Sequence, residues 1–453
     1  MSNANAFIEF PEAFTWGAAT SSYQIEGSPH LDGKGQSNWD AFCREPGRIK
    51  DGTSGAVACD HVRLYAEDVA LMAELGLDAY RFSIAWTRVH PNGGGAVNQK
   101  GLDFYDRLVD ELLAAGIEPL PTLYHWDLPQ ALEDKGGWQN RDTAKYFGSY
   151  TESVLDRLGD RIKTWTTLNE PYVSANHGYV TGEHAPGITS RAAGFSAAHH
   201  LLLGHGYAAE RVRGMTADAR LAIVLNFTPT EPAHDDEASV AECGRVHDLD
   251  NRWYIDPIAG NGYPEETGEF YGWEAEEVRD GDMELIAAPL DLLGVNYYMP
   301  QFVGAEGPLP APETSPQNTM GWEVHPPTLG KLLRWLHEDY DFPSILITEN
   351  GCPMPDEVRE NGQIIDDDRL RFVRDHLIEV HSAIADGVPV EGYLVWSLFD
   401  NFEWAWGYGP TFGIVEVDFD TLERRPKKSA DWYRDAIAAG GFALPDEPTT
   451  YRL

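Results

Sequence analysis

Apolar runs rich in β-branched and aromatic residues alternate along the chain with stretches whose apolar positions recur at helical spacing. This alternation is typical of repeated βα units and differs from the pattern of an all-β or an all-α protein. Because the apolar runs are nearly continuous, we expect parallel strands that are buried on both faces. The eight predicted strands are residues 14–20, 79–86, 118–126, 161–170, 220–227, 290–299, 344–351 and 390–400.

The stretches between these runs carry the signals of helix ends. Asp60 is placed to cap a helix at its start, and Gly76 follows the end of the same helix. The predicted buried faces are Tyr65, Val69 and Met72 in this helix and Leu102, Tyr105, Val109 and Leu112 in residues 98–116. Eight strands, each followed by a helix or a long loop, predict a closed α/β fold, the (β/α)8 TIM barrel.

A barrel of this kind accounts for the whole chain, so we expect a single catalytic (β/α)8 domain over residues 1–453. The alternative fold, an open doubly wound sheet, lacks its usual support. No G-x-G-x-x-G follows the first run, and no G-x-x-x-x-G-K-[S/T] occurs. The Gly- and Pro-rich residues 304–316 are expected to form a long loop after the sixth strand.

The excess of acidic over basic residues in the composition indicates an acidic surface. With 73 acidic residues against 34 Lys and Arg the formal net charge is −39, while 42% hydrophobic residues suffice for a large core. This charge repels nucleic acids and anionic membranes, so we expect neither as a partner. The short basic cluster of Arg424, Arg425, Lys427 and Lys428 is expected to be a solvated surface turn. Two interpretations of the acidic surface stay open, namely adaptation to high salt and an ordinary acidic cytosolic protein.

Targeting and redox signals are also informative. Residues 1–10 show no basic region followed by an apolar run, and no stretch of about 18 apolar residues occurs, so we expect a cytoplasmic protein. Cys43, Cys59, Cys243 and Cys352 show neither C-x-x-C spacing nor the pattern of a disulfide framework, so we expect reduced thiols.

Polar residues close nearly every predicted strand, where a barrel of this class carries its catalytic groups. Glu170 and Glu349 end the fourth and the seventh run, and these strands are expected to face one another across the mouth of the ring. A single Glu in such a place is more often a helix cap or the partner of a surface Arg. Two glutamates at strand ends, surrounded by polar residues from the other strands, predict a functional site. The neighbours are Gln24, Arg81, His125, Trp126, Asn169, Asn226, Asn296, Tyr298, Trp396, Glu403 and Trp404.

Two carboxyl groups in an aromatic-lined pocket suit the cleavage of a glycosidic bond. One carboxyl group can protonate the leaving oxygen while the other attacks the sugar or activates water. Gln24, His125, Asn169 and Glu403 offer the donors and acceptors that a ring of hydroxyl groups requires. The aromatic rings near strand ends are Trp16, Trp126, Trp322, Trp396, Trp404 and Trp406, with ordinary core packing an equal alternative for Trp16.

Other chemistries lack their motifs. No H-x-H ends the first strand, and neither H-E-x-x-H nor G-x-S-x-G occurs, so neither a metallohydrolase nor a serine hydrolase is predicted. His199, His200 and His205 lie in a helical stretch with Ala and Leu and are expected to be packed side chains, not metal ligands. We therefore expect no metal and no cofactor.

The motifs around these residues resemble the β-glucosidases of glycoside hydrolase family 1 over essentially the full chain. They are F-T-W-G-A-A-T at 14–20, Y-Q-I-E-G at 23–27, Y-H-W-D-L-P at 124–129, N-E-P at 169–171, T-E-N-G at 348–351 and W-S-L-F-D-N-F-E-W at 396–404. The resemblance implies that Glu170 is the general acid/base and Glu349 the nucleophile. It further implies net retention through a covalent glycosyl-enzyme, for which we expect carboxyl groups about 5 Å apart.

The same resemblance implies roles for the neighbouring residues. Arg81 and Tyr298 would keep Glu349 ionised, and Asn296 would lie beside the acid/base. Trp322 would form the platform for the aglycone. The residues implied in sugar binding are Gln24, His125, Trp126, Asn169, Glu403 and Trp404, with Trp396 beneath the ring.

The implied activity is release of the terminal non-reducing β-D-glucosyl residue from short β-linked gluco-oligosaccharides and aryl glucosides, as in cellulose degradation. Residues 402–406 keep the F-E-W-A-W sequence that family members acting on 6-phosphorylated sugars replace, which favours unphosphorylated substrates. A β-galactosidase or β-fucosidase of the same family is one alternative, and a non-catalytic sugar-binding barrel is another. The sequence leaves open whether the chain forms a homo-oligomer.

If adaptation to high salt explains the acidic surface, the thermal midpoint and the activity should both rise between low and molar salt. Screening weakens the repulsion among carboxylates of a chain with net charge −39. Thermal unfolding followed by circular dichroism over that salt range measures the midpoint. A flat or falling midpoint would support the ordinary acidic protein instead.

Overall fold

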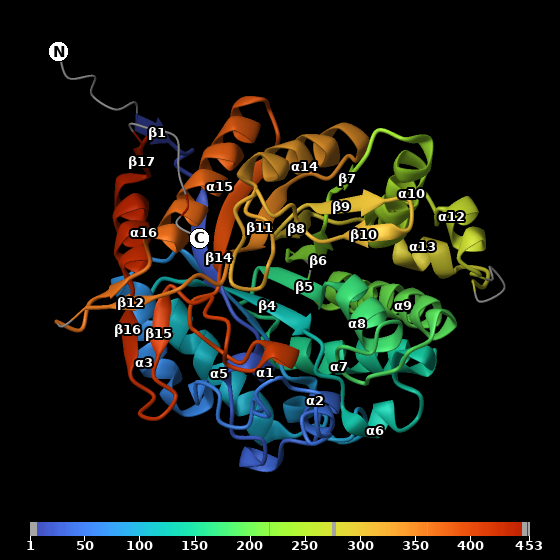
Figure 1. The fold of residues 1–453 in the computed structure, drawn as a ribbon. Coiled ribbons are helices and arrows are strands. Elements are labelled where there is room, and N and C mark those ends of the chain that lie inside the picture. Colours follow the sequence, from blue (N-terminus) through green and yellow to red (C-terminus); the bar gives the residue numbers. More distant parts are fainter. Residues whose placement is uncertain (1–6, 217, 274–277, 360, 446–450, 452–453) are drawn as a thin grey trace.

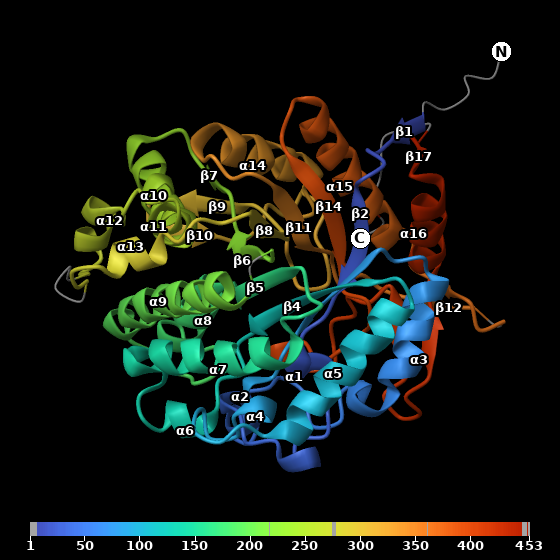
Figure 2. The same ribbon diagram turned by 180° about the vertical axis from the view of Figure 1, so that it is seen from behind.

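The computed structural model describes residues 7–216, 218–273, 278–359, 361–445 and 451. Eight parallel strands close into a barrel (Figures 1 and 2). The first barrel strand along the chain pairs with both the second and the last barrel strand. In ring order the strands are β2 (Thr15–Ala19), β3 (Ala79–Ser83), β4 (Glu118–Tyr124), β5 (Thr164–Asn169), β6 (Arg220–Phe227), β8 (Leu292–Tyr297), β11 (Ile345–Asn350) and β14 (Val390–Trp396).

Each predicted run contains one of these strands, so the expected (β/α)8 barrel is confirmed. Every residue of β3, β5, β8 and β11 is buried, as expected for strands covered by the barrel interior on one face and by helices on the other. Several runs extend past the observed strand. Residues such as Trp126, Glu170 and Tyr298 follow the last paired position and lie at the rim.

Helices cover the outside of the barrel (Figures 1 and 2). The helix expected after Asp60 is α3 (His61–Glu74), and Gly76 lies just past its end with a φ of 72°. Asp60 makes no capping hydrogen bond with its side chain. The helices are α1 (Ser22–Ile25), α2 (Asn38–Phe42), α3 (His61–Glu74), α4 (Trp86–Val89), α5 (Gln99–Ala114), α6 (Gln130–Glu133), α7 (Asp142–Leu158), α8 (Pro171–Tyr179), α9 (Arg191–Met215), α10 (Glu237–His247), α11 (Trp253–Ile258), α12 (Glu265–Phe270), α13 (Asp282–Ile286), α14 (Pro326–Asp339), α15 (Asp367–Ala385) and α16 (Lys428–Ala439).

Short strands outside the barrel correct one prediction. Residues 304–316 are not wholly a loop, because Gly307–Leu309 pairs with Gln301–Gly304 in a hairpin, which extends to Thr230–Pro232. The backbone hydrogen bonds of this small sheet hold part of the segment beside the barrel mouth. The outer strands are β1 (Phe7–Glu9), β7 (Thr230–Pro232), β9 (Gln301–Gly304), β10 (Gly307–Leu309), β12 (Glu357–Val358), β13 (Ile364–Ile365), β15 (Val415–Val417), β16 (Arg424–Pro426) and β17 (Gly441–Ala443).

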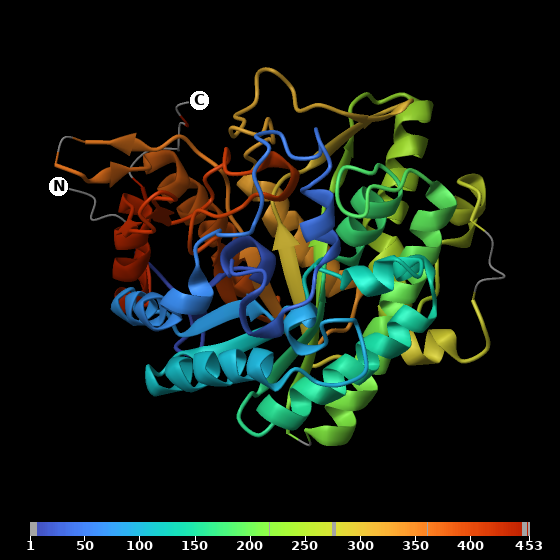
Figure 3. The ribbon, with the colours of Figure 1, turned by 90° about the horizontal axis from the view of Figure 1, so that it is seen from below.

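The first and last described strands lie together, since β1 pairs antiparallel with β17. In the view turned by 90°, the red C-terminal helix and the yellow helices lie on opposite sides of the molecule (Figure 3). Within the described ranges, no helix is long and apolar enough to cross a membrane.

The expectation for the basic cluster is wrong at Lys427. The side chain of Lys427 is fully buried, and its Nζ lies 2.8 Å from carboxylate oxygens of Asp356 and of Asp400. Arg424 is also largely buried against Asp68, whereas Lys428 keeps 43% of its side chain exposed. Lys427 is inside because its partners come from segments distant in sequence, which a local charge pattern does not reveal.

Candidate active site

A cavity of about 370 Å³ opens at the carboxyl ends of the barrel strands, within the size range of small-molecule sites. It brings together residues from the first half of the chain, such as His125, and from the last strand and its loop, such as Trp396 and Glu403. The predicted site residues that line it are His125, Trp126, Glu170, Tyr298, Trp322, Glu349, Trp396, Glu403 and Trp404. Asn226 and Trp406 also line it, whereas Trp16 packs against Phe10, Phe14 and Tyr433 in the core.

Four predicted residues lie behind this lining. Arg81 and Asn296 contact the two glutamates, Asn169 contacts His125, and Gln24 contacts Glu403. All four are at most 1% exposed. In this structure they support the residues that face the cavity.

Glu349 is held by donors on two sides. It lies in β11, where Arg81 Nη1 donates to its Oε1 at 2.5 Å and the Tyr298 hydroxyl donates to its Oε2 at 2.5 Å. Burial raises the pKa of Glu349, while the charge of Arg81 and the hydrogen bonds from Tyr298, Arg81 and Asn296 act to lower it. These partners favour the ionised carboxylate that a nucleophile requires.

Glu170 has a different environment. It follows β5 directly, and its Oε1 accepts one hydrogen bond at 2.6 Å from Asn296. Burial, followed by the negative charge of Glu349, raises the pKa of Glu170 to about 8. Glu170 therefore carries a proton at neutral pH and can serve as an acid.

One polar network joins the two carboxyl groups. The Asn169 Oδ1 atom accepts from Arg81 Nη2 at 2.6 Å and from Asn296 Nδ2 at 3.1 Å. Through these contacts Asn169 links the arginine that binds Glu349 to the asparagine that binds Glu170. The two glutamates consequently belong to one rigid unit at the barrel mouth.

The backbone around the cavity is bent at several site residues. Trp126, Glu170 and Trp404 have φ values of 75°, 47° and 48°, in the left-handed region that non-glycine residues seldom adopt. Strained conformations of this kind cluster at functional sites, where surrounding contacts hold them. Gly351 has a related role after Glu349, since a Cβ atom there would lie 1.5 Å from the carbonyl oxygen of Trp396.

Aromatic rings form one wall of the cavity. The ring of Trp404 lies 4.5 Å from that of Trp126 and is supported from behind by Trp39 at 4.6 Å. Trp322 comes from another segment and packs edge-on against Tyr298 at 5.8 Å. Such rings present flat apolar faces beside the carboxyl groups, as the stacking of sugar rings requires.

His125 offers an unused donor. Its Nε2 lies 3.1 Å from the Asn169 amide nitrogen, which can only donate, so Nε2 is the acceptor. Burial and the charge of Arg81 lower the pKa of His125 well below its usual value, which keeps the ring neutral. The proton then resides on Nδ1, which is buried and has no hydrogen-bond partner among the described residues.

Sequence reasoning missed the outer part of the cavity. Tyr172 and His177 come from α8, and Asp250 comes from the helical turn Asp248–Arg252. Attention to strand ends overlooks side chains on the helix that follows Glu170, although polar and aromatic residues so soon after it were a usable signal. The missed lining residues are Tyr172, Val173, His177, Glu183, His184, Phe227, Thr228, Asp250, Met299, Gln301, Met320 and Phe412.

The cavity is acidic. Carboxyl groups of Glu183 and Asp250 on the outer side join those of Glu170, Glu349 and Glu403, and no Lys or Arg occurs among the described lining residues. Burial raises the pKa of Asp250 to about 7 and that of Glu403 to about 8, with the charge of Glu349 contributing at Glu403. The charge distribution therefore suits a neutral ligand and opposes an anionic one.

The histidines of α9 are packed, as expected. His200 contacts the Trp138 carbonyl oxygen at 2.9 Å, and His205 contacts the Thr167 hydroxyl at 2.7 Å. His199 lies between Tyr263 and Asp282. Over the described ranges, no group of three or more His, Cys, Asp or Glu side chains is arranged to hold a metal ion.

The class of protein follows from this geometry, because a (β/α)8 barrel with two networked glutamates in a cavity at its strand ends is the arrangement of a barrel glycosidase. The family model described as Glycosyl hydrolase family 1 matches residues 7–442, and the chain belongs to this family.

Similar proteins agree with this assignment. β-Glucosidase A of Acetivibrio thermocellus is 45% identical over 448 residues, covering 96% of this chain and 99% of its own. A bifunctional β-D-glucosidase/β-D-fucosidase of Bifidobacterium breve is 42% identical and covers 95% of this chain and 98% of its own. The structure of a Thermotoga maritima β-glucosidase in complex with glucoimidazole superposes with a TM-score of 0.92 at 43% identity, covering 96% of this chain and 100% of that one.

Removing the Tyr298 hydroxyl should move the acidic limb of the activity profile. The hydrogen bond from Tyr298 lowers the pKa of Glu349, so Tyr298→Phe raises that pKa, and activity is lost at a higher pH as the medium is acidified. We expect the lower limb of kcat/KM to move to higher pH, with a smaller change in the upper limb. The pH dependence of kcat/KM on a nitrophenyl β-glucoside measures both limbs.

Tyr297→Phe is the matched control. The Tyr297 hydroxyl donates to the His325 carbonyl oxygen, away from Glu349, so this variant should keep both limbs in place. Equal lower limbs in Tyr298→Phe and the wild type would show that the hydroxyl does not stabilise the Glu349 carboxylate.

Proposed function

We propose that this chain is a retaining, exo-acting β-glucosidase that releases the terminal non-reducing β-D-glucosyl residue from short β-linked gluco-oligosaccharides and aryl glucosides. We take residues 1–453 as one catalytic domain. The observation that carries the proposal is the contrast between two glutamates in one cavity. Glu349 is bound by a guanidinium group and a phenol, whereas Glu170 is bound by one amide and has a pKa of about 8.

In the first step Glu170 donates its proton to the glycosidic oxygen while a carboxylate oxygen of Glu349 attacks the anomeric carbon. The bond between that carbon and the glycosidic oxygen breaks, the protonated aglycone departs, and the glucosyl group is esterified to Glu349. Attack from the face opposite the leaving group inverts the anomeric carbon once.

The second step reverses the role of Glu170. Esterification removes the negative charge of Glu349, which is one cause of the raised pKa of Glu170, so Glu170 now gives up its proton readily. As a base it takes a proton from water while the water oxygen attacks the anomeric carbon and the Glu349 carboxylate leaves. The second inversion gives net retention.

Binding of a neutral glucosyl unit is supported by the acidic lining, which contains no Lys or Arg among the residues that the structure describes. The proposed contacts are His125 and Glu403 for hydroxyl groups, Trp126, Trp396 and Trp404 for the glycone ring and Trp322 for the aglycone. In this proposal Gln24 and Asn169 act beside Glu403 and His125, whose orientation they set.

We also propose a reducing compartment, the cytoplasm, as the place of action. All four cysteines, Cys43, Cys59, Cys243 and Cys352, are unpaired, and three of them are buried. Proteins of oxidising compartments more often join their cysteines in disulfides.

Replacing Glu349 with Gly should abolish turnover of nitrophenyl β-glucoside, with kcat falling by at least about 10³-fold because no nucleophile remains. Added azide should restore release of nitrophenol from an activated donor, since the small anion fits the space of the lost side chain. The exposed Glu357, replaced by Gly in the same way, is the control and should keep wild-type activity.

Unchanged activity of Glu349→Gly would remove this residue from the nucleophile role. A wild-type protein that binds glucose but releases no nitrophenol would contradict the proposal and indicate the alternative, a sugar-binding barrel.

Activity on β-fucosides and β-galactosides is a second candidate, which the bifunctional name of the Bifidobacterium breve relative favours. Rates on nitrophenyl β-D-glucoside, β-D-fucoside and β-D-galactoside should rank glucoside or fucoside above galactoside by kcat/KM. A dominant galactoside rate would instead make the chain a β-galactosidase.

A further inference from the structure

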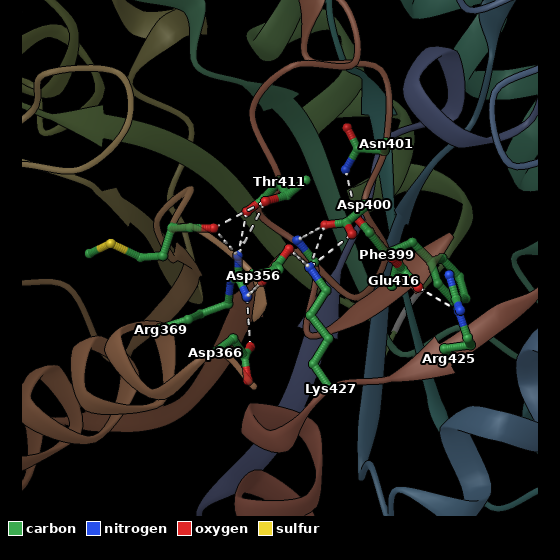
Figure 4. A network of polar contacts seen from close by, with 12 residues as sticks. Asp356, Asp366, Arg369, Phe399, Asp400, Asn401, Thr411, Glu416, Arg425 and Lys427 are labelled. Atoms are coloured by element: carbon green, nitrogen blue, oxygen red, sulfur yellow. Dashed lines mark hydrogen bonds and ion pairs between the residues drawn. The ribbon is translucent and has the colours of Figure 1, made fainter. Parts of the chain in front are cut away.

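A chain of five charged side chains, of which all but the partly exposed Asp356 are buried, lies beside the cavity and takes no part in the reaction described above. Lys427 and Arg369 are 0% and 1% exposed in their side chains. Lys427 Nζ lies 2.8 Å from both Asp356 and Asp400, and Arg369 Nη1 lies 2.7 Å from Asp356 and 2.6 Å from Asp366. Figure 4 shows these contacts as one continuous network, which we call the buried ion cluster (Asp356, Asp366, Arg369, Asp400 and Lys427).

The members of the buried ion cluster come from separate segments. Asp356 follows β11, the strand of Glu349, and Asp400 follows β14, its neighbour in the ring. Arg369 and Asp366 lie at the start of α15, and Lys427 directly precedes α16. The cluster thus ties the segment that leaves the strand of the nucleophile to the segment that leaves the last strand.

The segment after β14, residues 397–413, is the loop that carries Glu403 and Trp404 into the cavity. The buried ion cluster holds both of its arms. Asp400 Oδ1 accepts from the backbone nitrogen of Gly413 at 2.8 Å. Arg369 Nη2 donates to the carbonyl oxygen of Thr411 at 2.6 Å (Figure 4). Between these points the loop extends to the sugar site.

Gln24 holds the same loop from the other side. Its Nε2 donates to Asn401 Oδ1 at 2.9 Å and to the Phe402 carbonyl oxygen at 3.0 Å, and it lies 3.4 Å from a carboxylate oxygen of Glu403. Asn401 is the neighbour of Asp400. Along the loop, the ion cluster therefore holds Asp400, and the Gln24 amide holds Asn401 and Phe402. The next residue, Glu403, lines the cavity.

Stability alone does not explain such a cluster. The cost of removing charges from water can equal or exceed their attraction, and well-packed apolar side chains often replace a buried ion pair without loss. Charged groups differ from apolar ones in holding their partners at fixed distances and directions. Fixed distances and directions of this kind are needed in a loop that presents the carboxyl group of Glu403 to a sugar.

We propose that the buried ion cluster, through Lys427 and Asp400, positions the 397–413 loop so that Glu403 meets the substrate held over Glu349. The inference rests on the proposed function. Lys427 and Asp400 are positioning residues, because they act on the sugar only through the loop.

The test removes one cation and one anion together. Lys427→Met with Asp400→Asn keeps the formal charge of the cluster and the approximate size of both side chains. Asp400→Asn alone is the milder variant and decides the question if the double variant does not fold. Each is assayed on nitrophenyl β-glucoside well below its own thermal midpoint, so that the measured kcat and KM are those of folded protein.

We expect kcat/KM to fall at least tenfold in the double variant, with most of the change in KM. The decisive comparison repeats the change in a Glu403→Gln background, where it should lower kcat/KM less than threefold because the positioned group is already altered. A purely structural role would give the same factor in both backgrounds.

The neighbouring pair supplies the matched control. Lys428 bonds Asp367 at 2.6 Å near the surface, so Lys428→Met with Asp367→Asn should change kcat/KM less than twofold. Equal factors in the two backgrounds, or an unchanged kcat/KM in folded Lys427 and Asp400 variants, would overturn the inference. An inactive wild type would instead refute the proposed function, which distinguishes the two failures.

Discussion

The buried contact between Arg81 and Glu349 is the constraint on which the rest of the site depends. A carboxylate inside the barrel mouth loses its hydration, and a cation with hydrogen-bond donors at short distances is needed to keep it charged. Arg81 belongs to β3 and Glu349 to β11, and two strands, β14 and β2, lie between them in the ring. The two side chains can meet only across the interior of a closed barrel, so the charge of Glu349 is a property of the whole fold.

The same contact makes the two glutamates different. Arg81 Nη1 donates to Glu349 and its Nη2 donates to Asn169. Glu170 instead accepts its hydrogen bond from the amide of Asn296. Burial, and after it the negative charge of Glu349, raises the pKa of Glu170. One arginine thus gives the two carboxyl groups different surroundings, with no cation among the described lining residues.

Sequence reasoning reached the barrel and its two glutamates because both rest on local patterns. Each strand is a nearly continuous apolar run, and Glu170 and Glu349 interrupt such runs at their ends. The prediction that Lys427 lies at the surface was wrong because its position depends on contacts distant in sequence. Beside Pro426 and Lys428 it has the local pattern of a surface turn, and its burial depends on carboxylates contributed by residues far away in sequence.

Closure of the ring also constrains how the protein is made. The first barrel strand, β2, pairs on one side with β14, with Gly17 opposite Leu394, so the ring stays open until residues 390–396 have left the ribosome. Contacts between such distant segments form slowly, and unpaired strand edges invite association with other chains. A nascent chain that already includes Glu170 and Glu349 therefore has two unpaired strand edges and no closed cavity, and at this stage association with other chains competes with folding.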